Sequence, residues 1–402
     1  MPTTAGRGTI DVSPTRAMPA GGMGGRGASF LSGGASAAKA GSAPAPPAGA
    51  AGASSVVSTL TRRWVQLAVP SLSEALTGLP VLLRIQTSLL RGATDGAGLR
   101  FFSAEGEALP YEVELWAAGG EALIWVRAPE LRPNGNGYGF WLYYGGQDSP
   151  PSTFSASDVW APSYSAVWHM ADKVADSSGH QQSEGAANMG SFAASKIGAG
   201  LFLKRLEKDF VKLPEYADFV SGASGVTVSA WVKHDRSLEP TLQKGQQILF
   251  ATSIAEPSHI SRVSVAVSSA GELIGEANPD DGPYEWALSP RDSVADREWS
   301  YVTVVIDVPR KTTRLYVNGD SVGERQGMWT GSLFLSTPSG ENAIGSEEGG
   351  VDSWFNGMID ELRVDKVARS SEWVRLQALA AGCAPQFASL SPAQDVLGYA
   401  LP

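Results

Sequence analysis

The stretch that decides the fold lies near the C-terminus and reads Ala343–Ile344–Gly345–Ser346, a Gly-rich loop, and then Phe355–Asn356–Gly357–Met358–Ile359–Asp360–Glu361–Leu362–Arg363–Val364. An Asn-Gly pair favours a tight turn, and the apolar and polar residues after it alternate with the period of two that is typical of a β-strand. Ser370 or Ser371 then offers an N-cap, with Glu372 in the first turn, so we predict a helix from Trp373 that Gly382 ends. This order predicts the closing strand and helix of an antiparallel sheet domain.

Strands are expected throughout residues 156–382. The most regular is Gly225–Lys233, where Val226, Val228, Ala230 and Val232 fall on one face. The others that we expect are 164–170, 299–306, 314–317, 331–335 and 358–364. Asn318–Gly319 directly follows the strand expected at 314–317 and is a strong signal for a hairpin turn.

A separate group of short strands occupies residues 58–155. The apolar runs and alternating patterns lie at 79–85, 99–102, 111–116, 122–127 and 139–144, with Gly and Pro between them. Glu112 and Glu114 share one face of the third run, which we interpret as a solvated face. The group predicts a small all-β domain.

Several spaced motifs of residues 160–375 occur in a recognisable order. They are Trp168–His169, Asp176–Ser177–Ser178–Gly179, Ser229–Ala230–Trp231–Val232, Trp299 before its strand, Leu315–Tyr316–Val317–Asn318–Gly319 and Ile359–Asp360–Glu361–Leu362–Arg363–Val364. This ordered set resembles the laminin-G-like, concanavalin A-type jelly roll. The resemblance implies an all-β chain, and domains of this type usually bind other molecules rather than transform them.

The first group of strands carries a second resemblance. Its motifs are Leu79–Pro80–Val81, Asp95–Gly96 with Leu99–Arg100–Phe101, Leu109–Pro110–Tyr111–Glu112, Ile124–Trp125–Val126 and Leu142–Tyr143–Tyr144–Gly145. They resemble a bacterial domain-of-unknown-function family that is often found directly before laminin-G-like domains. We therefore predict two tandem antiparallel β-sandwich domains, at 58–155 and 156–382. Residues 1–57 are rich in Gly, Ala, Ser and Pro and predict a disordered leader, and 383–402 predict a tail.

Composition excludes several classes of function. The 402 residues carry a formal net charge of −10, and no basic block interleaves with aromatics, so we expect no nucleic-acid partner. Cys383 is the one cysteine, which excludes an intrachain disulfide. No apolar run reaches the roughly 18 residues of a membrane span. No signal peptide is visible in this chain, but the resemblance still implies an extracellular or cell-surface location.

Asp360 is the acid that most suggests a metal site. The alternation places it on the face of Met358, Leu362 and Val364, and an inward carboxylate needs a partner. Related jelly rolls often join their first and last strands through one structural Ca²⁺, and Asp176 is the natural second ligand here. Ca²⁺ needs six to eight oxygens, so two readings stay open: a Ca²⁺ site, or a hydrogen-bonded acid without metal.

Aromatic side chains in predicted loops suggest a ligand site. Carbohydrate modules stack sugar rings on Trp or Tyr near polar groups, and loops at one end of a sandwich commonly bind ligands. The candidate ligand-binding residues are Tyr284, Trp286, Trp329, Trp354, Asp281 and Asp352. Each Trp has the alternative of packing in the core.

Enzyme motifs are missing from the sequence. No strand carries the closely spaced carboxylates of a jelly-roll glycosidase, and His169 beside Trp168 reads as a packed or hydrogen-bonded residue. We therefore predict a non-catalytic recognition or adhesion module that binds glycan or surface protein. Two alternatives stay open: a structural subunit that contacts neighbouring subunits of an envelope or filament assembly, and a glycan-acting hydrolase with an unrecognised site.

Overall fold

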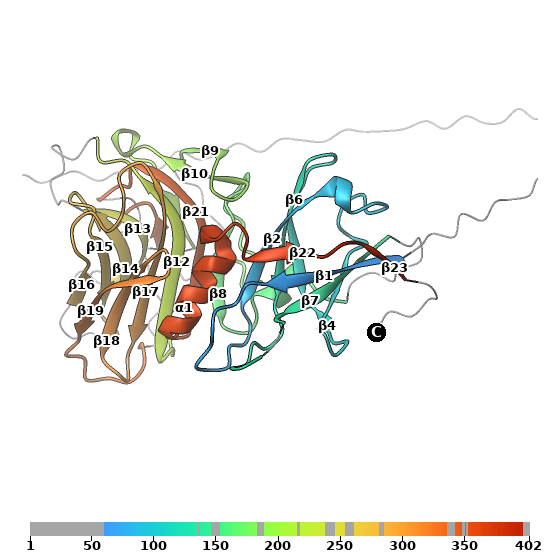
Figure 1. Cartoon of the computed structure of the whole chain (residues 1–402). Helices are drawn as coiled ribbons and strands as arrows, with labels where there is room; N and C mark the ends of the chain where they lie inside the picture. The colour runs from blue at the N-terminus through green and yellow to red at the C-terminus, as the bar shows by residue number, and fades with distance from the viewer. Residues whose placement is uncertain are drawn as a thin grey trace, which may run out of the picture. The chain divides into compact units, whose positions relative to one another are not determined.

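The computed structural model describes most of the chain after the leader. The described residues are 60–135, 137–145, 153–182, 189–214, 218–237, 246–253, 261–280, 285–335, 342–347, 350 and 353–396. They belong to one compact unit. The predicted disordered leader, 1–57, lies outside the described residues. The all-β fold class is confirmed, and Figure 1 shows the strands.

The first domain consists of two sheets. One has the order β22-β1-β7-β3-β4, with β23 also on β1, and the other has the order β2-β6-β5. The strands are β1 (Leu60–Leu67), β2 (Pro80–Gln86), β3 (Arg100–Phe102), β4 (Ala108–Leu109), β5 (Tyr111–Trp116), β6 (Glu121–Arg127), β7 (Gly139–Tyr144), β22 (Ala388–Leu390) and β23 (Gln394–Val396). The five strands that the sequence predicts here are all present as β2, β3, β5, β6 and β7.

The sequence predicts a tail at 383–402, but residues 388–390 and 394–396 form strands β22 and β23 instead. β22 pairs antiparallel with β1 through Val65 and Leu390, and β23 pairs with it through Leu60 and Val396. Figure 1 shows this red segment beside blue β1. The pairing satisfies backbone groups of β1 that would otherwise form an open sheet edge. The first domain is therefore completed by residues that follow the second domain in sequence.

The second domain is a sandwich of two larger sheets. The first has the order β19-β18-β17-β12-β21-β10-β9 with β8 on β21, and the second has the order β11-β20-β13-β14-β15-β16. The strands are β8 (Tyr164–Trp168), β9 (Ser191–Ala194), β10 (Ala199–Leu203), β11 (Val211–Lys212), β12 (Gly225–His234), β13 (Gln246–Ser253), β14 (Ser261–Ser268), β15 (Leu273–Ala277), β16 (Glu285–Leu288), β17 (Trp299–Asp307), β18 (Thr312–Val317), β19 (Asp320–Gln326), β20 (Ala343–Ile344) and β21 (Gly357–Asp365).

Local sequence explains several of these elements. Val226, Val228, Ala230 and Val232 of β12 lie in the core between the two sheets, as their alternation predicts. Asn318 and Gly319 both have positive φ, 54° and 89°, which is the backbone of the tight turn that joins β18 to β19. The strand expected at 331–335 does not form, because these residues run as a bend outside the ladders.

A capped helix follows β21, as predicted. Helix α1 (Ser371–Ala378) begins after Ser370, whose side chain accepts a hydrogen bond from the Trp373 amide. It continues into a π-helical turn at Leu379–Cys383, where Gly382 has φ +105°. The carboxylate of Glu372 accepts hydrogen bonds of 2.9 and 3.1 Å from the backbone amides of Ser73 and Glu74. The helix therefore attaches the second domain to the loop between β1 and β2.

The central strand β21 has an irregularity that reverses part of the predicted alternation. Arg363 pairs with Ser229 and Asp360 pairs with Trp231, so two residues of β21 oppose one residue of β12. Glu361 within this bulge has φ +52°. Ile359, Leu362 and Val364 consequently face the core of the sandwich, and Met358 does not belong to that core. The prediction that Asp360 shares the face of Leu362 was wrong, because a bulge shifts every residue before it to the other face.

The outer face of the eight-stranded sheet is also buried. One continuous apolar cluster contains Trp125 of the first domain, Trp231 and Tyr301 of that sheet, and Trp373 of α1. A second cluster fills the space between the two sheets of the sandwich. The two domains therefore share a core, and side chains of β21 that point away from the sandwich interior meet the first domain.

A pair of leucines tests this arrangement. Leu362 on β21 is 0% exposed, whereas Leu206 is 74% exposed. We expect Leu362→Ala to lower the free energy of unfolding by about 2–5 kcal/mol, because it leaves a cavity in the sandwich core. Leu206→Ala should change the urea midpoint very little. Equal effects of the two substitutions would contradict the described burial.

Candidate functional site

Charged side chains from both domains meet at His169. This residue directly follows β8, and its Nδ1 lies 2.6 Å from Oε1 of Glu361 on β21. Its Nε2 lies 3.2 Å from Oε2 of Glu112 on β5. Oε2 of Glu114, also on β5, is 3.8 Å from Nδ1. His169 is therefore hydrogen-bonded and buried, as the sequence predicts, and it lies between acids of the two domains.

Two tryptophans and an arginine complete this buried cluster. Trp160 Nε1 donates to Glu112 at 2.7 Å, and Trp125 Nε1 donates to Glu114 at 2.8 Å. Arg363 Nη2 donates to Glu361 at 2.6 Å. The guanidinium carbon of Arg363 also lies 4.2 Å from the centre of the Trp125 ring and 4.7 Å from that of Trp160. Arg363 thus combines an ion pair with two aromatic contacts.

Burial corrects the interpretation of Glu112 and Glu114 as a solvated pair. The side chain of Glu112 is 12% exposed and that of Glu114 is 2% exposed. The packing of the second domain over β5 covers both carboxylates, which alternation within one strand cannot show. Both carboxylates also accept hydrogen bonds from tryptophan, so neither is presented to a substrate from solvent.

The acids of the cluster have opposite pKa shifts. Burial raises the pKa of Glu114, and the nearby charge of Glu361 adds to that effect, giving a pKa of about 8. Burial also raises the pKa of Glu361, but the charges of His169 and Arg363 lower it by more than burial raises it, to about 2. Burial lowers the pKa of His169, yet Glu361 and Glu112 hold it well above its usual value. Glu361, Arg363 and His169 are therefore charged together at neutral pH.

The two acids of the predicted calcium site accept hydrogen bonds from protein groups. Oδ2 of Asp360 accepts hydrogen bonds from Ser195 Oγ at 2.6 Å and from the Ile197 amide at 2.8 Å. Oδ1 of Asp176 accepts from the Val167 and Ser178 amides at 3.0 and 2.9 Å. Calcium binding by this pair stays a prediction. Within the described residues, the group of His, Cys, Asp and Glu side chains arranged to hold a metal is Glu114, His169 and Glu361, whose ligand atoms lie within 4.8 Å of one another.

The predicted aromatic ligand residues have different surroundings. Trp286 is 48% exposed on β16, at the edge of the six-stranded sheet. Trp329 is 1% exposed in the sandwich core, which is the packing alternative that the sequence left open. Trp354 is partly buried, with Lys208 Nζ 5.0 Å from its ring centre. The other three predicted residues lie outside the described residues; they are Tyr284, Asp281 and Asp352.

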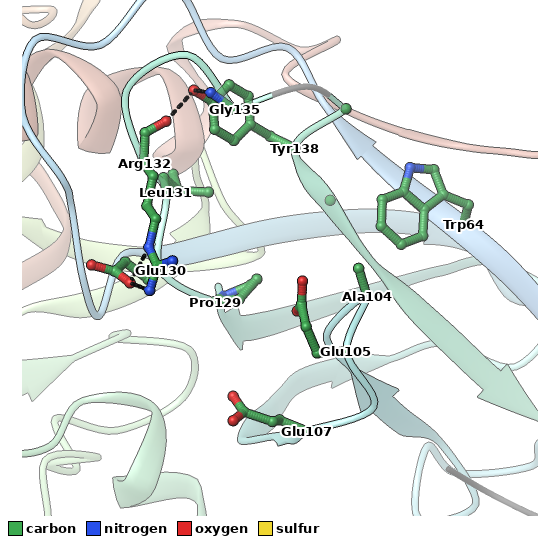
Figure 2. A pocket seen from close by; sticks show the side chains of 12 residues that line it. Trp64, Ala104, Glu105, Glu107, Pro129, Glu130, Leu131, Arg132, Gly135 and Tyr138 are labelled. Carbon is green, nitrogen blue, oxygen red and sulfur yellow. Dashed lines mark hydrogen bonds and ion pairs between the residues drawn. The ribbon is translucent and has the colours of Figure 1, made fainter.

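A surface hollow of about 380 Å³ opens in the first domain, and none of the predicted ligand-binding residues lines it. Trp64 of β1 and Tyr138, just before β7, line it together with Glu105 and Glu107 of the β3–β4 turn. Figure 2 shows Trp64 and the Glu130–Arg132 ion pair at opposite sides of the hollow, with Glu105 between them in this view.

Neighbouring residues fix the two aromatic side chains that line this hollow. Trp64 packs edge-on against Trp141, with ring centres 5.1 Å apart, and its indole Nε1 donates to Gln66. A Cβ on Gly139 would lie 2.8 Å from the Trp64 ring, so glycine is needed for this placement. The Tyr138 hydroxyl donates to the Arg132 carbonyl at 2.5 Å and accepts from the Gly135 amide. Two aromatic side chains are thus fixed beside exposed carboxylates.

Comparison with known families agrees with the predicted domain order. Residues 206–375 match the family model described as the Concanavalin A-like lectin/glucanases superfamily (Laminin_G_3). Residues 95–161 match a domain of unknown function, DUF2341. Both recognitions and their order along the chain are confirmed. A search of curated proteins finds no match.

The chain also matches several solved structures at low sequence identity. The binding domain of Paraclostridial Mosquitocidal Protein 1 is 14% identical with a TM-score of 0.41, over 56% of this chain and 52% of that one, so this chain spans about half its length. Domain 4 of AbnA, an arabinanase from Geobacillus stearothermophilus, is 18% identical with a TM-score of 0.38, over 54% and 98%. A Ruminococcus gnavus sialidase CBM40 is 19% identical with a TM-score of 0.32, over 39% and 83%.

Arg363 provides a test of the buried cluster. Its side chain is 1% exposed and its partner Glu361 is 0% exposed, so Arg363→Ala leaves a buried carboxylate short of a cation. We expect the free energy of unfolding to fall by about 3–5 kcal/mol in urea denaturation. Arg310 also pairs with an acid, Asp307, but it is 80% exposed, and Arg310→Ala should leave the midpoint almost unchanged. Similar midpoints for the two variants would show that Arg363 is not buried with its partner.

Proposed function

We propose that this chain, whose residues 206–375 are a concanavalin A-like domain, is a non-catalytic recognition module that binds glycan at a bacterial cell surface. The observation that carries the proposal is the hollow of Figure 2, which combines fixed aromatic faces with exposed carboxylates. Its volume of about 380 Å³ lies toward the small end of ordinary ligand pockets, which span roughly 300–1,000 Å³. Such a site suits one or two sugar rings rather than a protein domain.

The chemistry of the lining supports a sugar ligand. A sugar ring presents C–H groups on its faces and hydroxyls around its rim, so it packs on an aromatic ring and donates to carboxylates. Trp64 supplies the aromatic face, and Glu105 and Glu107 supply acceptors. None of the residues drawn in Figure 2 donates a hydrogen bond to either of these two carboxylates, and both side chains are exposed and so available to a ligand.

The charge of the hollow favours some sugars over others. Glu130 is neutralised by Arg132 at 2.6 Å, whereas Glu105 and Glu107 have no such ion pair among the described residues. A sugar with its own carboxylate would meet repulsion, while a neutral or amino sugar would not. We therefore expect binding of neutral or amino sugars to exceed binding of acidic ones.

The proposal also separates binding from hydrolysis. Glycoside hydrolysis needs two carboxyl groups on opposite sides of one scissile bond, one of them often with a raised pKa. Glu114 has the raised pKa, but its side chain is 2% exposed and lies behind Trp125. Incubation with a polysaccharide panel should accordingly release no new reducing ends.

Glycan-array screening of the full chain, followed by titration calorimetry of the best neutral or amino sugar, tests the site. We expect Trp64→Ala to weaken binding at least about tenfold, because the stacking face is lost. Glu107→Gln should weaken it several-fold without affecting the fold, since this side chain is exposed. Circular dichroism of Trp64→Ala checks that the contact with Trp141 is not needed for folding.

Trp286→Ala provides the comparison, because it removes an exposed tryptophan face at the edge of the second domain. We expect its affinity to equal that of the parent chain. Loss of binding in Trp286→Ala, with normal binding in Trp64→Ala and Glu107→Gln, would move the site to the edge of the second domain. An array without any bound glycan would contradict the proposed function itself.

A further inference from the structure

Three side chains with metal-ligating atoms converge where the two domains meet. Glu114 comes from β5 of the first domain, and His169 and Glu361 come from the second. Their ligand atoms all lie within 4.8 Å of one another. Both glutamates lie at bulges: the register of β5 shifts between Val113 and Leu115, and that of β21 shifts at Glu361. Bulges redirect individual side chains, and they are frequent beside functional sites.

Each of these three side chains is oriented by a hydrogen-bond partner of its own. The Nε2 of His169 faces Glu112, so that its Nδ1 is left for the cluster. Glu112 is in turn held by Trp160 and by the Ser177 hydroxyl, each at 2.7 Å. Trp125 holds Glu114, and Arg363 holds Glu361. A carboxylate behind the histidine and a donor behind each acid are the usual outer contacts of a metal site.

The cluster holds more acids than cations. Glu112, Glu114, Asp360 and Glu361 are four carboxyl groups beside two cations, His169 and Arg363, and burial raises the pKa of the two acids that have no cation of their own, Glu114 and Asp360. Glu114 is more than nine-tenths buried, and its Oε1 has no hydrogen-bond partner among the described residues. An acceptor without a donor in a buried position is costly unless a cation or a proton occupies the site.

We propose that Glu114, His169 and Glu361 bind one divalent transition-metal ion, of the Zn²⁺ type, that joins the two domains. One imidazole nitrogen and two carboxylate oxygens are ligands that Zn²⁺, Co²⁺ and Mn²⁺ accept. Ca²⁺ takes oxygen ligands only, so this site differs in both place and chemistry from the Asp176–Asp360 pair. The inference does not depend on the glycan site, which lies on other residues.

Binding requires a small rearrangement and the release of two protons. Ligand atoms on one tetrahedral Zn²⁺ lie roughly 3.3–3.6 Å apart, given metal–ligand distances of about 2.0–2.2 Å. The 2.6 Å between His169 Nδ1 and Glu361 Oε1 must therefore lengthen, and the 3.8 Å between Nδ1 and Glu114 must shorten, each by less than about 1 Å. One proton leaves Nδ1, and a second leaves the Glu114 carboxyl group, whose pKa of about 8 keeps it largely protonated at neutral pH. Both protons go to solvent, the nitrogen lone pair and the Glu114 carboxylate then bind the ion, and Nε2–H still donates to Glu112.

The side chains that would hold the ion are at most 9% exposed, so we expect the ion to be enclosed as the domains pack together. Metal analysis of the full chain, purified without chelator, should then find about one equivalent of Zn²⁺ or a related ion. Removal with a chelator should lower the melting temperature, and added Zn²⁺ should restore it. Co²⁺ in its place should give the visible absorption bands of a low-symmetry site.

Glu114→Gln is the decisive variant, because its amide oxygen still accepts from Trp125 while the ligand charge is gone. We expect it to weaken Zn²⁺ binding at least about tenfold and to leave the chelated protein folded. Glu324→Gln, an exposed glutamate on β19, should bind Zn²⁺ like the parent chain. A chain that contains no metal as purified and whose melting temperature ignores Zn²⁺, Co²⁺ and Mn²⁺ would overturn the proposal. Unchanged Zn²⁺ affinity in Glu114→Gln would also overturn it.

Discussion

The contact between His169 and Glu361, with Glu112 on the other side of the imidazole, is the interaction on which the rest of the structure depends. A buried imidazolium is stable only where carboxylates match its charge, and here those carboxylates come from both domains. Separating the domains would leave these charges either without partners or newly solvated. The two domains therefore behave as one body rather than as two modules on a linker. Strands β22 and β23 add to this connection, because they follow the second domain in sequence and pair with β1 of the first domain.

This joint determines which surfaces remain for ligands. The outer face of the eight-stranded sheet is covered by α1 and the first domain, as the shared apolar cluster shows. Side chains on that face, such as Arg363 and Tyr301, are 1% and 0% exposed. That face of the sheet is thereby closed to ligands, whereas loop ends and sheet edges remain open. The hollow beside Trp64 and the exposed edge at Trp286 are both of this kind.

Local patterns in the sequence were enough to predict much of the fold. The alternation of β12 and the Asn318–Gly319 turn depend on neighbouring residues, and both are confirmed. A bulge is harder to predict, because one extra residue has no distinctive composition, and so the face of Asp360 relative to Leu362 was assigned wrongly. The return of 388–396 to β1 is a pairing over more than 300 positions, which no short pattern encodes.

The candidate sites show the same limit for single residues. Trp64 and Trp329 have equal chemistry, and loop position made Trp329 the better candidate for ligand contact. In the structure Trp329 is 1% exposed inside the sandwich, while Trp64 lines an open hollow because Gly139 leaves room for its ring. What separates a binding face from a core side chain is therefore the element that covers it. For Glu112 and Glu114, likewise, the second domain turns an apparently solvated pair into a buried one.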